Sequence, residues 1–146
     1  MYVQTAITLF NKRLSTDRRE VYIPTCITGA SFFESRGSSH ATDGIHSESI
    51  TYKLRIPIDA KVQADRTYLS ETAFRALTAE EARGHWTIQK GDIVLACATE
   101  LTDPVDERKL KELARGNLVN VITVKEYADN TIRGSMDVRH WRIGGE

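Results

Sequence analysis

Hydrophobic and polar residues alternate along several short stretches of the chain. The clearest alternation covers residues 49–58, SITYKLRIPI, where apolar side chains hold the even positions and polar residues or proline hold most of the odd ones. Residues 5–14, TAITLFNKRL, place Ile7 and Leu9 on one face and Phe10 on the other. Because a period of two is typical of strands with one buried face, both stretches are predicted as β-strands.

Further apolar runs predict additional strands. Residues 20–33, rich in β-branched and aromatic side chains, are expected to pair with residues 5–14 across a Ser-Thr-Asp break. Pro24 has no amide hydrogen, so this strand is expected to lie at an edge or to carry a bulge there. Residues 86–101 predict a strand, a Lys90-Gly91-Asp92 turn and a second strand, because Gly and Asp suit positive φ.

The C-terminal region predicts a hairpin. Residues 118–127 and 136–145 are expected to form its two strands, with a turn at Asp129-Asn130. Gly144-Gly145 lies near the last residue of the sequence and is expected to belong to a frayed end.

Three stretches carry signals for helix ends. Ser70 is a candidate N-cap for a short helix that ends at Ala76. Residues 78–81, Thr-Ala-Glu-Glu, have the spacing of a capping box, and Gly84 is placed to end that turn. A longer helix is expected over residues 104–115, with Asp103 as N-cap and Pro104 as its first residue.

These elements together predict a mainly β protein. The number and length of the strands favour a small antiparallel β-barrel or sandwich, with short helical insertions and one longer helix. The length of 146 residues is that of one domain, so residues 1–146 are expected to form a single barrel-like domain.

One tract does not fit a packed element. Residues 35–48 are rich in Gly, Ser, His, Thr and Asp, and we expect them to form a flexible loop that becomes ordered against a partner. Phe32 and Phe33 precede this loop in a predicted strand. Since neighbouring strand residues point to opposite faces, one of the two rings must point away from the core unless another layer covers it.

Composition narrows the range of partners. Lys plus Arg and Asp plus Glu each number 20, so the formal net charge is zero and nothing global indicates binding to nucleic acid or an anionic membrane. Cys26 and Cys97 lie far apart in apolar stretches and are expected to be free thiols, with a disulfide as the alternative. No signal peptide or membrane span is predicted, so the protein is expected to be soluble and made in the cytoplasm.

Candidate chemistry is sparse. His40, Asp43 and His46 have a spacing that on a helix would gather metal ligands, but the surrounding glycines and serines disfavour a helix. No nucleophile elbow, phosphate-binding loop or dinucleotide fingerprint occurs. We therefore expect neither enzyme activity nor a cofactor or metal. An alternative is a nucleic-acid-binding barrel, for which Lys53 and Arg55 share one strand face opposite Tyr52.

Several motifs resemble a family of small proteins encoded in the head-to-tail module of tailed phages and prophages. They are AITLFNKR, YIPTCITGASF, YLSETAF, TIQKGDIVL, VITVKEYADN and RHWRIGG, which span nearly the whole chain. More distantly, the order of elements is similar to that of head-closure and head-tail joining proteins, which are β-barrels that form rings. The segment 67–84 and the predicted helix 104–115 depart from the more purely β pattern of head-closure proteins.

This resemblance implies a structural virion component, a head-closure or connector ring subunit between the portal or adaptor and the tail. It implies a homo-oligomer, twelvefold at the adaptor and closure levels or sixfold at the tail terminator, through which DNA passes without sequence-specific binding. A tail terminator or another minor tail or capsid component is the alternative. The candidate interface residues come from the polar tract and the strand before it: Phe32, Phe33, Arg36, His40, Asp43 and His46.

Overall fold

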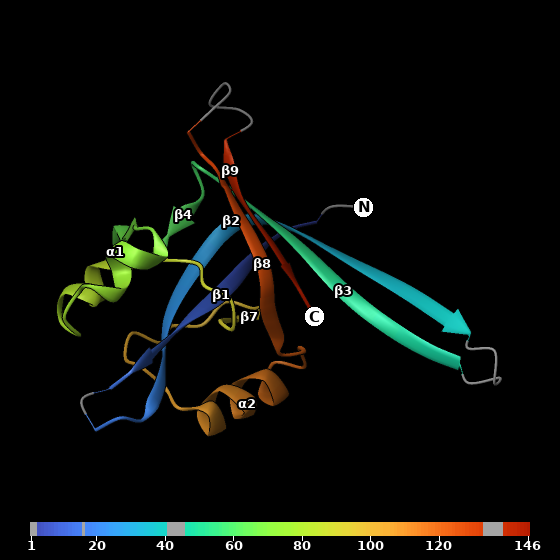
Figure 1. Ribbon diagram of the computed structural model, residues 1–146, viewed down its shortest axis with the longest axis horizontal. Helices are drawn as coiled ribbons and strands as arrows, with labels where there is room; N and C mark the ends of the chain where they lie inside the picture. Colours follow the sequence, from blue (N-terminus) through green and yellow to red (C-terminus); the bar gives the residue numbers. More distant parts are fainter. Residues whose placement is uncertain (1–2, 16, 41–45, 133–138) are drawn as a thin grey trace.

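Six antiparallel strands close into a barrel in the computed structural model, which describes residues 3–15, 17–40, 46–132 and 139–146 (Figure 1). Around the barrel the strands follow the order β1-β7-β8-β9-β3-β2, and β2 pairs with β1 to complete the circle. The mainly β prediction is confirmed, and of its two alternatives the barrel is the one observed. The strands are β1 (Val3–Leu14), β2 (Glu20–His40), β3 (His46–Pro57), β7 (Ile93–Leu95), β8 (Ile122–Asn130) and β9 (His140–Gly145).

The predicted pairing of β1 with β2 is confirmed, and its one irregularity lies at a glycine. Thr5 pairs with Ala30 and Ala6 with Thr28, so Gly29 is an extra residue on β2. Gly29 has a φ of +96°, a conformation that other residues disfavour and that glycine adopts readily at a bulge. The bulge is at Gly29, whereas Pro24 pairs in register with Phe10.

The alternating pattern of the first strand separates two cores. Ile7 and Leu9 point into the barrel, where they join the aliphatic residues of β3 and β9. Phe10 lies on the outer face and packs with Leu110 and Ala114 of helix α2 (Glu107–Gly116), which covers that side of the barrel. The barrel core comprises Ile7, Leu9, Ile27, Ala30, Tyr52, Leu54, Ile56, Trp86, Ile88, Val94, Ile122, Val124, Trp141 and Ile143.

Helix α2 begins later than its sequence signals predict. Its N-cap is Asp106, whose carboxylate accepts a 2.8 Å hydrogen bond from the backbone amide of Lys109. Val105 exchanges two backbone hydrogen bonds with Tyr22 of β2, at 2.8 and 2.9 Å, so the chain is still extended there. The expected start at Asp103-Pro104 is therefore wrong, because pairing with β2 takes precedence over the local capping signal.

The chain between β3 and β7 forms short elements beside the barrel. The short helix α1 (Glu71–Arg75) has Ser70 as N-cap, as predicted. Thr78 and Glu81 exchange the two hydrogen bonds of a capping box at the start of the 3-10 helix η2, at 3.0 and 3.2 Å. The elements of this segment are β4 (Lys61–Val62), η1 (Gln63–Asp65), β5 (Thr67–Tyr68), α1, η2 (Glu81–Gly84) and β6 (His85–Trp86).

The Lys90-Gly91-Asp92 turn is present, but it does not join two paired strands. Strand β6 ends at Trp86 and pairs in parallel with β5, not with the strand after the turn. Gly91 has the expected positive φ of +91°, whereas Asp92 does not. The amide of Gly91 donates to the carbonyl of Val124 in β8, so the turn packs against that strand.

The C-terminal hairpin of β8 and β9 is confirmed, but Gly144-Gly145 is not frayed. Gly144 pairs with Lys53 on one side and Glu126 on the other, and Gly145 pairs with Tyr52 and Val124. The predicted turn at Asp129-Asn130 is wrong, since β8 continues to Asn130, opposite His140. Among the described residues, no helix has the length and apolar character needed to cross a membrane.

Candidate functional site

The hairpin of β2 and β3 extends beyond the barrel as an arm (Figure 1). In the described part of the chain, neither strand has another partner over six pairs, from Ser35–Thr51 to His40–His46. At a rise of about 3.3 Å per residue this ribbon is about 20 Å long. We call residues 35–40 and 46–51 the arm.

The base of the arm is anchored in the barrel core. The rings of Phe32 and Tyr52 lie 5.5 Å apart between centroids, tilted by 31°. Ile50, which belongs to the second pair of the arm counted from the barrel, also packs against the core. The hydroxyl of Tyr52 accepts a 3.0 Å hydrogen bond from the side-chain amide of Asn120, which precedes β8. The root of the arm is thus held by several elements.

A flexible loop is predicted over residues 35–48, and the structure places strands over most of that range, while the flexibility of this segment stays a prediction. Residues 35–40 and 46–48 pair in register as strands. Such polar residues are poor strand formers by composition, but backbone pairing extends easily from a ladder that the barrel has already fixed.

The predicted interface residues are distributed along this hairpin. Phe32 packs against the barrel core and Phe33 is half-buried on the opposite face, as the alternation predicts. His40 and His46 face each other as the last described pair, so they lie on two strands and not on the helix that the metal hypothesis needs. Arg36 is paired with Ile50, and Asp43 lies outside the described residues. Among the described residues no group of metal-ligating side chains is found.

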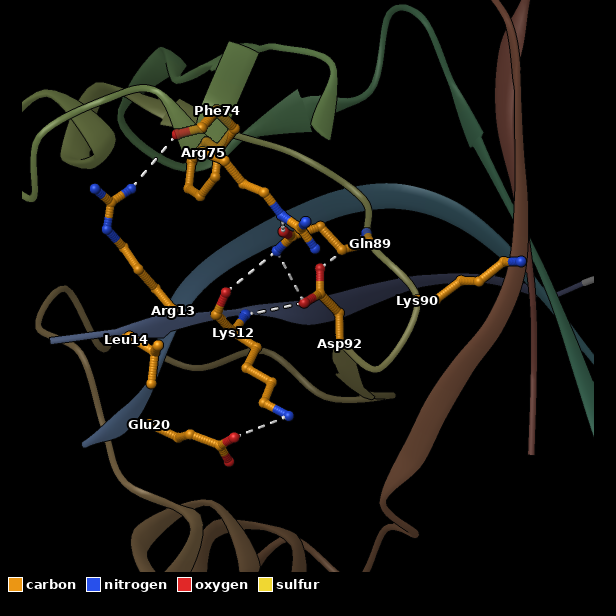
Figure 2. Close-up of a pocket in the computed structure, with 9 residues that line it drawn as sticks. All are labelled: Lys12, Arg13, Leu14, Glu20, Phe74, Arg75, Gln89, Lys90 and Asp92. Carbon is orange, nitrogen blue, oxygen red and sulfur yellow. Dashed lines mark hydrogen bonds and ion pairs between the residues drawn. The ribbon is translucent and has the colours of Figure 1, made fainter. Parts of the chain in front are cut away.

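A second candidate is a polar cleft of about 520 Å³ between β1, α1 and the Gly91 turn (Figure 2). Asp92 lies at its base, completely buried. One carboxylate oxygen, Oδ1, accepts from the backbone amide of Lys12 at 2.9 Å and the side-chain amide of Gln89 at 3.2 Å. The other accepts from the side chain of Asn11 at 2.8 Å and the backbone amide of Gln89 at 3.0 Å.

These contacts make Asp92 a structural group. Burial raises the pKa of Asp92 to about 7, against the opposing effect of its four donors. Each oxygen accepts two hydrogen bonds and the side chain is completely buried, so we assign Asp92 a structural role and not one in binding a ligand in the cleft.

The cationic side chains around the cleft mostly have protein partners. Lys12 pairs with Glu20 at 3.2 Å, and Arg75 pairs with Glu71 at 2.7 Å. Arg13 donates to the carbonyl oxygens of Phe74 and Leu77, and its guanidinium lies 5.9 Å from the Phe74 ring centroid. The cleft residues therefore tie α1 to the end of β1 and β2, and we assign them a structural role.

Cys26 and Cys97 are free thiols, as expected, and both are half-buried. Burial raises the pKa of Cys97, so its thiol is less reactive than an exposed cysteine.

The chain belongs to a family described as a family of unknown function, DUF6751, whose model matches residues 2–146. Neither the search of curated proteins nor that of solved structures found a match.

Proposed function

We propose that this protein is a structural subunit of a homo-oligomeric ring in the connection between head and tail of a tailed phage. The observation that carries the proposal is the arm, whose two strands have no further partner in the described chain over six residue pairs. The motifs that resemble head-to-tail module proteins supply the biological setting.

The arm is suited to contact with another subunit. An isolated two-stranded ribbon is marginally stable in water, and its two outer edges present unpaired amide and carbonyl groups. A neighbouring subunit satisfies these groups by adding a strand or by covering an edge. Because the root of the arm is fixed by Phe32 and Tyr52, the arm reaches a neighbour at a defined angle.

The charge balance is compatible with many copies in one ring. With 20 basic and 20 acidic residues the subunit has no net charge, so copies do not repel one another through a summed field. A ring of identical subunits uses heterologous contacts, in which an arm on one copy meets a different surface on the next.

The test is the mass of the assembly as a function of concentration. Native mass spectrometry and light scattering should find a monomer in dilute solution and one closed ring at high concentration, which electron microscopy then counts. In a phage that carries the gene, a deletion should leave filled heads and free tails unjoined. A stable dimer at every concentration, or normal virions from the deletion strain, would rule the proposal out.

A further inference from the structure

A hollow of about 510 Å³ lies between the end of β3, the β4–β5 segment and β9, apart from the arm and the polar cleft. Its apolar wall includes Ile58, Val62, Tyr68, Trp86 and Trp141. This volume is within the range of sites that hold small molecules, which are mainly apolar with a few polar groups.

The apolar wall is built around three aromatic rings. Tyr68 lies 5.0 Å from Trp86 and 4.9 Å from Trp141, and the two tryptophan rings are 4.9 Å apart at an angle of 70°. Their mutual packing fixes the rings, so the wall is rigid before any ligand arrives. The buried indole N–H of Trp141 has no hydrogen-bond acceptor in the described structure.

Arg66 also lines the hollow, and its positive charge is not balanced. Its side chain is 8% exposed. Nη1 donates to the carbonyl oxygen of Pro24 at 2.5 Å and to the hydroxyl of Thr25 at 2.8 Å. Nε is buried without an acceptor, and among the described residues no carboxylate forms an ion pair with this guanidinium.

A buried cation without an anionic partner is unfavourable in a folded protein. The two neutral oxygen acceptors on β2 hold Arg66 in place but leave its charge uncompensated. Burial lowers the pKa of Arg66, and the positive charge of Arg83 lowers it further. An arginine still stays protonated, so the site keeps its positive charge.

The other charged residues of the hollow are exposed. Lys61 and Asp65 both line it, and Asp65 makes no ion pair with Arg66. With Lys61 and Arg66 against Asp65, the lining carries one net positive charge. The fork of donors on a guanidinium matches the oxygens of a carboxylate or a phosphate.

We propose that this hollow binds a small organic anion, a carboxylate or phosphate group attached to a flat apolar or aromatic body. The anion pairs with Arg66, and the apolar body packs against the wall of Tyr68 and Trp141. This site is independent of the ring, so either proposal stands without the other.

The two tryptophans in the chain both line the hollow, so intrinsic tryptophan fluorescence reports on this site alone. We would titrate the wild-type protein with phenylacetate, with phenyl phosphate and with the neutral isostere phenylacetamide. At least one of the anions should give a saturable change, with an affinity about tenfold or more above that of phenylacetamide, since one charged hydrogen bond contributes that much. The better of the two anions identifies the group that the site prefers.

Arg66→Gln should weaken binding of the preferred anion by about tenfold or more. The matched control is Arg108→Gln on the exposed face of α2, which should bind as the wild type does. If Arg66→Gln does not fold, the indole N–H signal of Trp141 in a nitrogen–proton spectrum of the wild type replaces it, and this signal should shift with the anion. Equal affinity for phenylacetamide, or no saturable response to either anion, would overturn the proposal.

Discussion

The side-chain amide of Asn11 donates a 2.8 Å hydrogen bond to the carboxylate of Asp92, although 81 positions separate the two residues. Both side chains are completely buried. The same amide donates to the carbonyl oxygen of Thr87 at 2.7 Å, and the Asn11 carbonyl oxygen accepts from the Thr87 amide at 3.2 Å. Asn11 thus joins β1 both to Thr87, which precedes the Lys90-Gly91-Asp92 turn, and to Asp92 within that turn.

Asn11→Ala should destabilise the protein by about 2–4 kcal/mol, because it leaves the Thr87 backbone groups without partners and removes one donor from Asp92. Urea denaturation of the variant and the wild type measures this difference. Asn117→Ala is the matched control, since Asn117 is exposed and its side chain bonds, within the described chain, only the carbonyl oxygen of Leu113. An equal loss of unfolding free energy in the two variants would show that the buried hydrogen-bond network does not contribute to stability.

The buried carboxylate also predicts a pH dependence. Burial raises the pKa of Asp92 from 3.8 to about 7, so ionisation of this group disfavours the folded state. Its contribution is most favourable below pH 3.8, declines as pH rises to about 7 and is constant above that, a change on the order of 4 kcal/mol at most. Asp92→Asn cannot ionise and should lack this component.

The measurement is the difference in unfolding free energy between wild type and Asp92→Asn at a series of pH values from 4 to 8. A pKa shift of one unit corresponds to about 1.4 kcal/mol in this difference. The wild type should lose stability relative to the variant as pH rises. Carbon NMR of the Asp92 carboxyl group in the wild type gives the same titration without a variant. A flat difference together with a titration near the ordinary pKa of aspartate would contradict the prediction.

A feature of this structure can be predicted from the sequence when its contacts join residues that are close in the chain. The alternation in residues 49–58 predicts the buried face of β3, and Ser70 predicts the start of α1, because both signals involve neighbours in the chain. Asp92 carries a local turn signal, but nothing in the sequence indicates that Asn11 would reach it. Arg66 carries no signal either, since its acceptors lie on β2.

Tertiary pairing also overrides local signals at two places. Asp103-Pro104 has the composition of a helix start, but Val105 pairs with Tyr22 and delays the helix to Glu107. Gly144-Gly145 has the composition of a frayed end, but β9 needs small residues where it passes β8. Local composition indicates which backbone conformations a segment tolerates, whereas pairing with a neighbouring strand determines which conformation it adopts.

The closing strand predicts a contrast between adjacent glycines. A Cβ at Gly145 would stand 2.6 Å from the carbonyl oxygen of Thr123, a backbone atom that cannot move aside without disturbing β8. At Gly144 the nearest atoms all belong to the Glu126 side chain, with Oε1 at 2.7 Å and Cγ at 2.8 Å, and this flexible side chain can turn away without moving the backbone of β8. Gly145→Ala should therefore lose about 2–3 kcal/mol of stability, and Gly144→Ala clearly less.

Thermal and urea unfolding of the two variants test this contrast. Gly116→Ala serves as the control, because nothing lies within 4 Å of its added Cβ at the end of α2. That change should be neutral or stabilising by up to about 1 kcal/mol. Equal losses of stability for Gly144→Ala and Gly145→Ala would mean that the β8 backbone moves aside as easily as the Glu126 side chain, which would contradict the prediction.

The arm gives the last prediction. Outside the barrel, the hydrogen bonds of residues 35–40 and 46–51 are supported only by each other in the described chain, so the amides of the isolated subunit should exchange rapidly there. Amides of β1 and of β2 up to Phe32 should exchange slowly, because both strands lie within the closed barrel. When rings form, the arm should become protected while the barrel changes little. Hydrogen exchange followed by mass spectrometry compares the two states.

A shortened arm separates folding from assembly. Residues 37–49 would be replaced by Asn-Gly, which joins the facing pair Arg36 and Ile50 through a two-residue turn. The variant should keep the wild-type melting temperature to within about 2–4 °C, since no barrel contact of the described chain is removed. It should fail to form rings at any concentration.

A matched variant with Asn-Gly in place of residues 41–45 keeps every described pair of the arm and should still assemble. Ring formation by the shortened variant would show that the arm is dispensable, and strong amide protection of the arm in the monomer would show that it belongs to the stable fold.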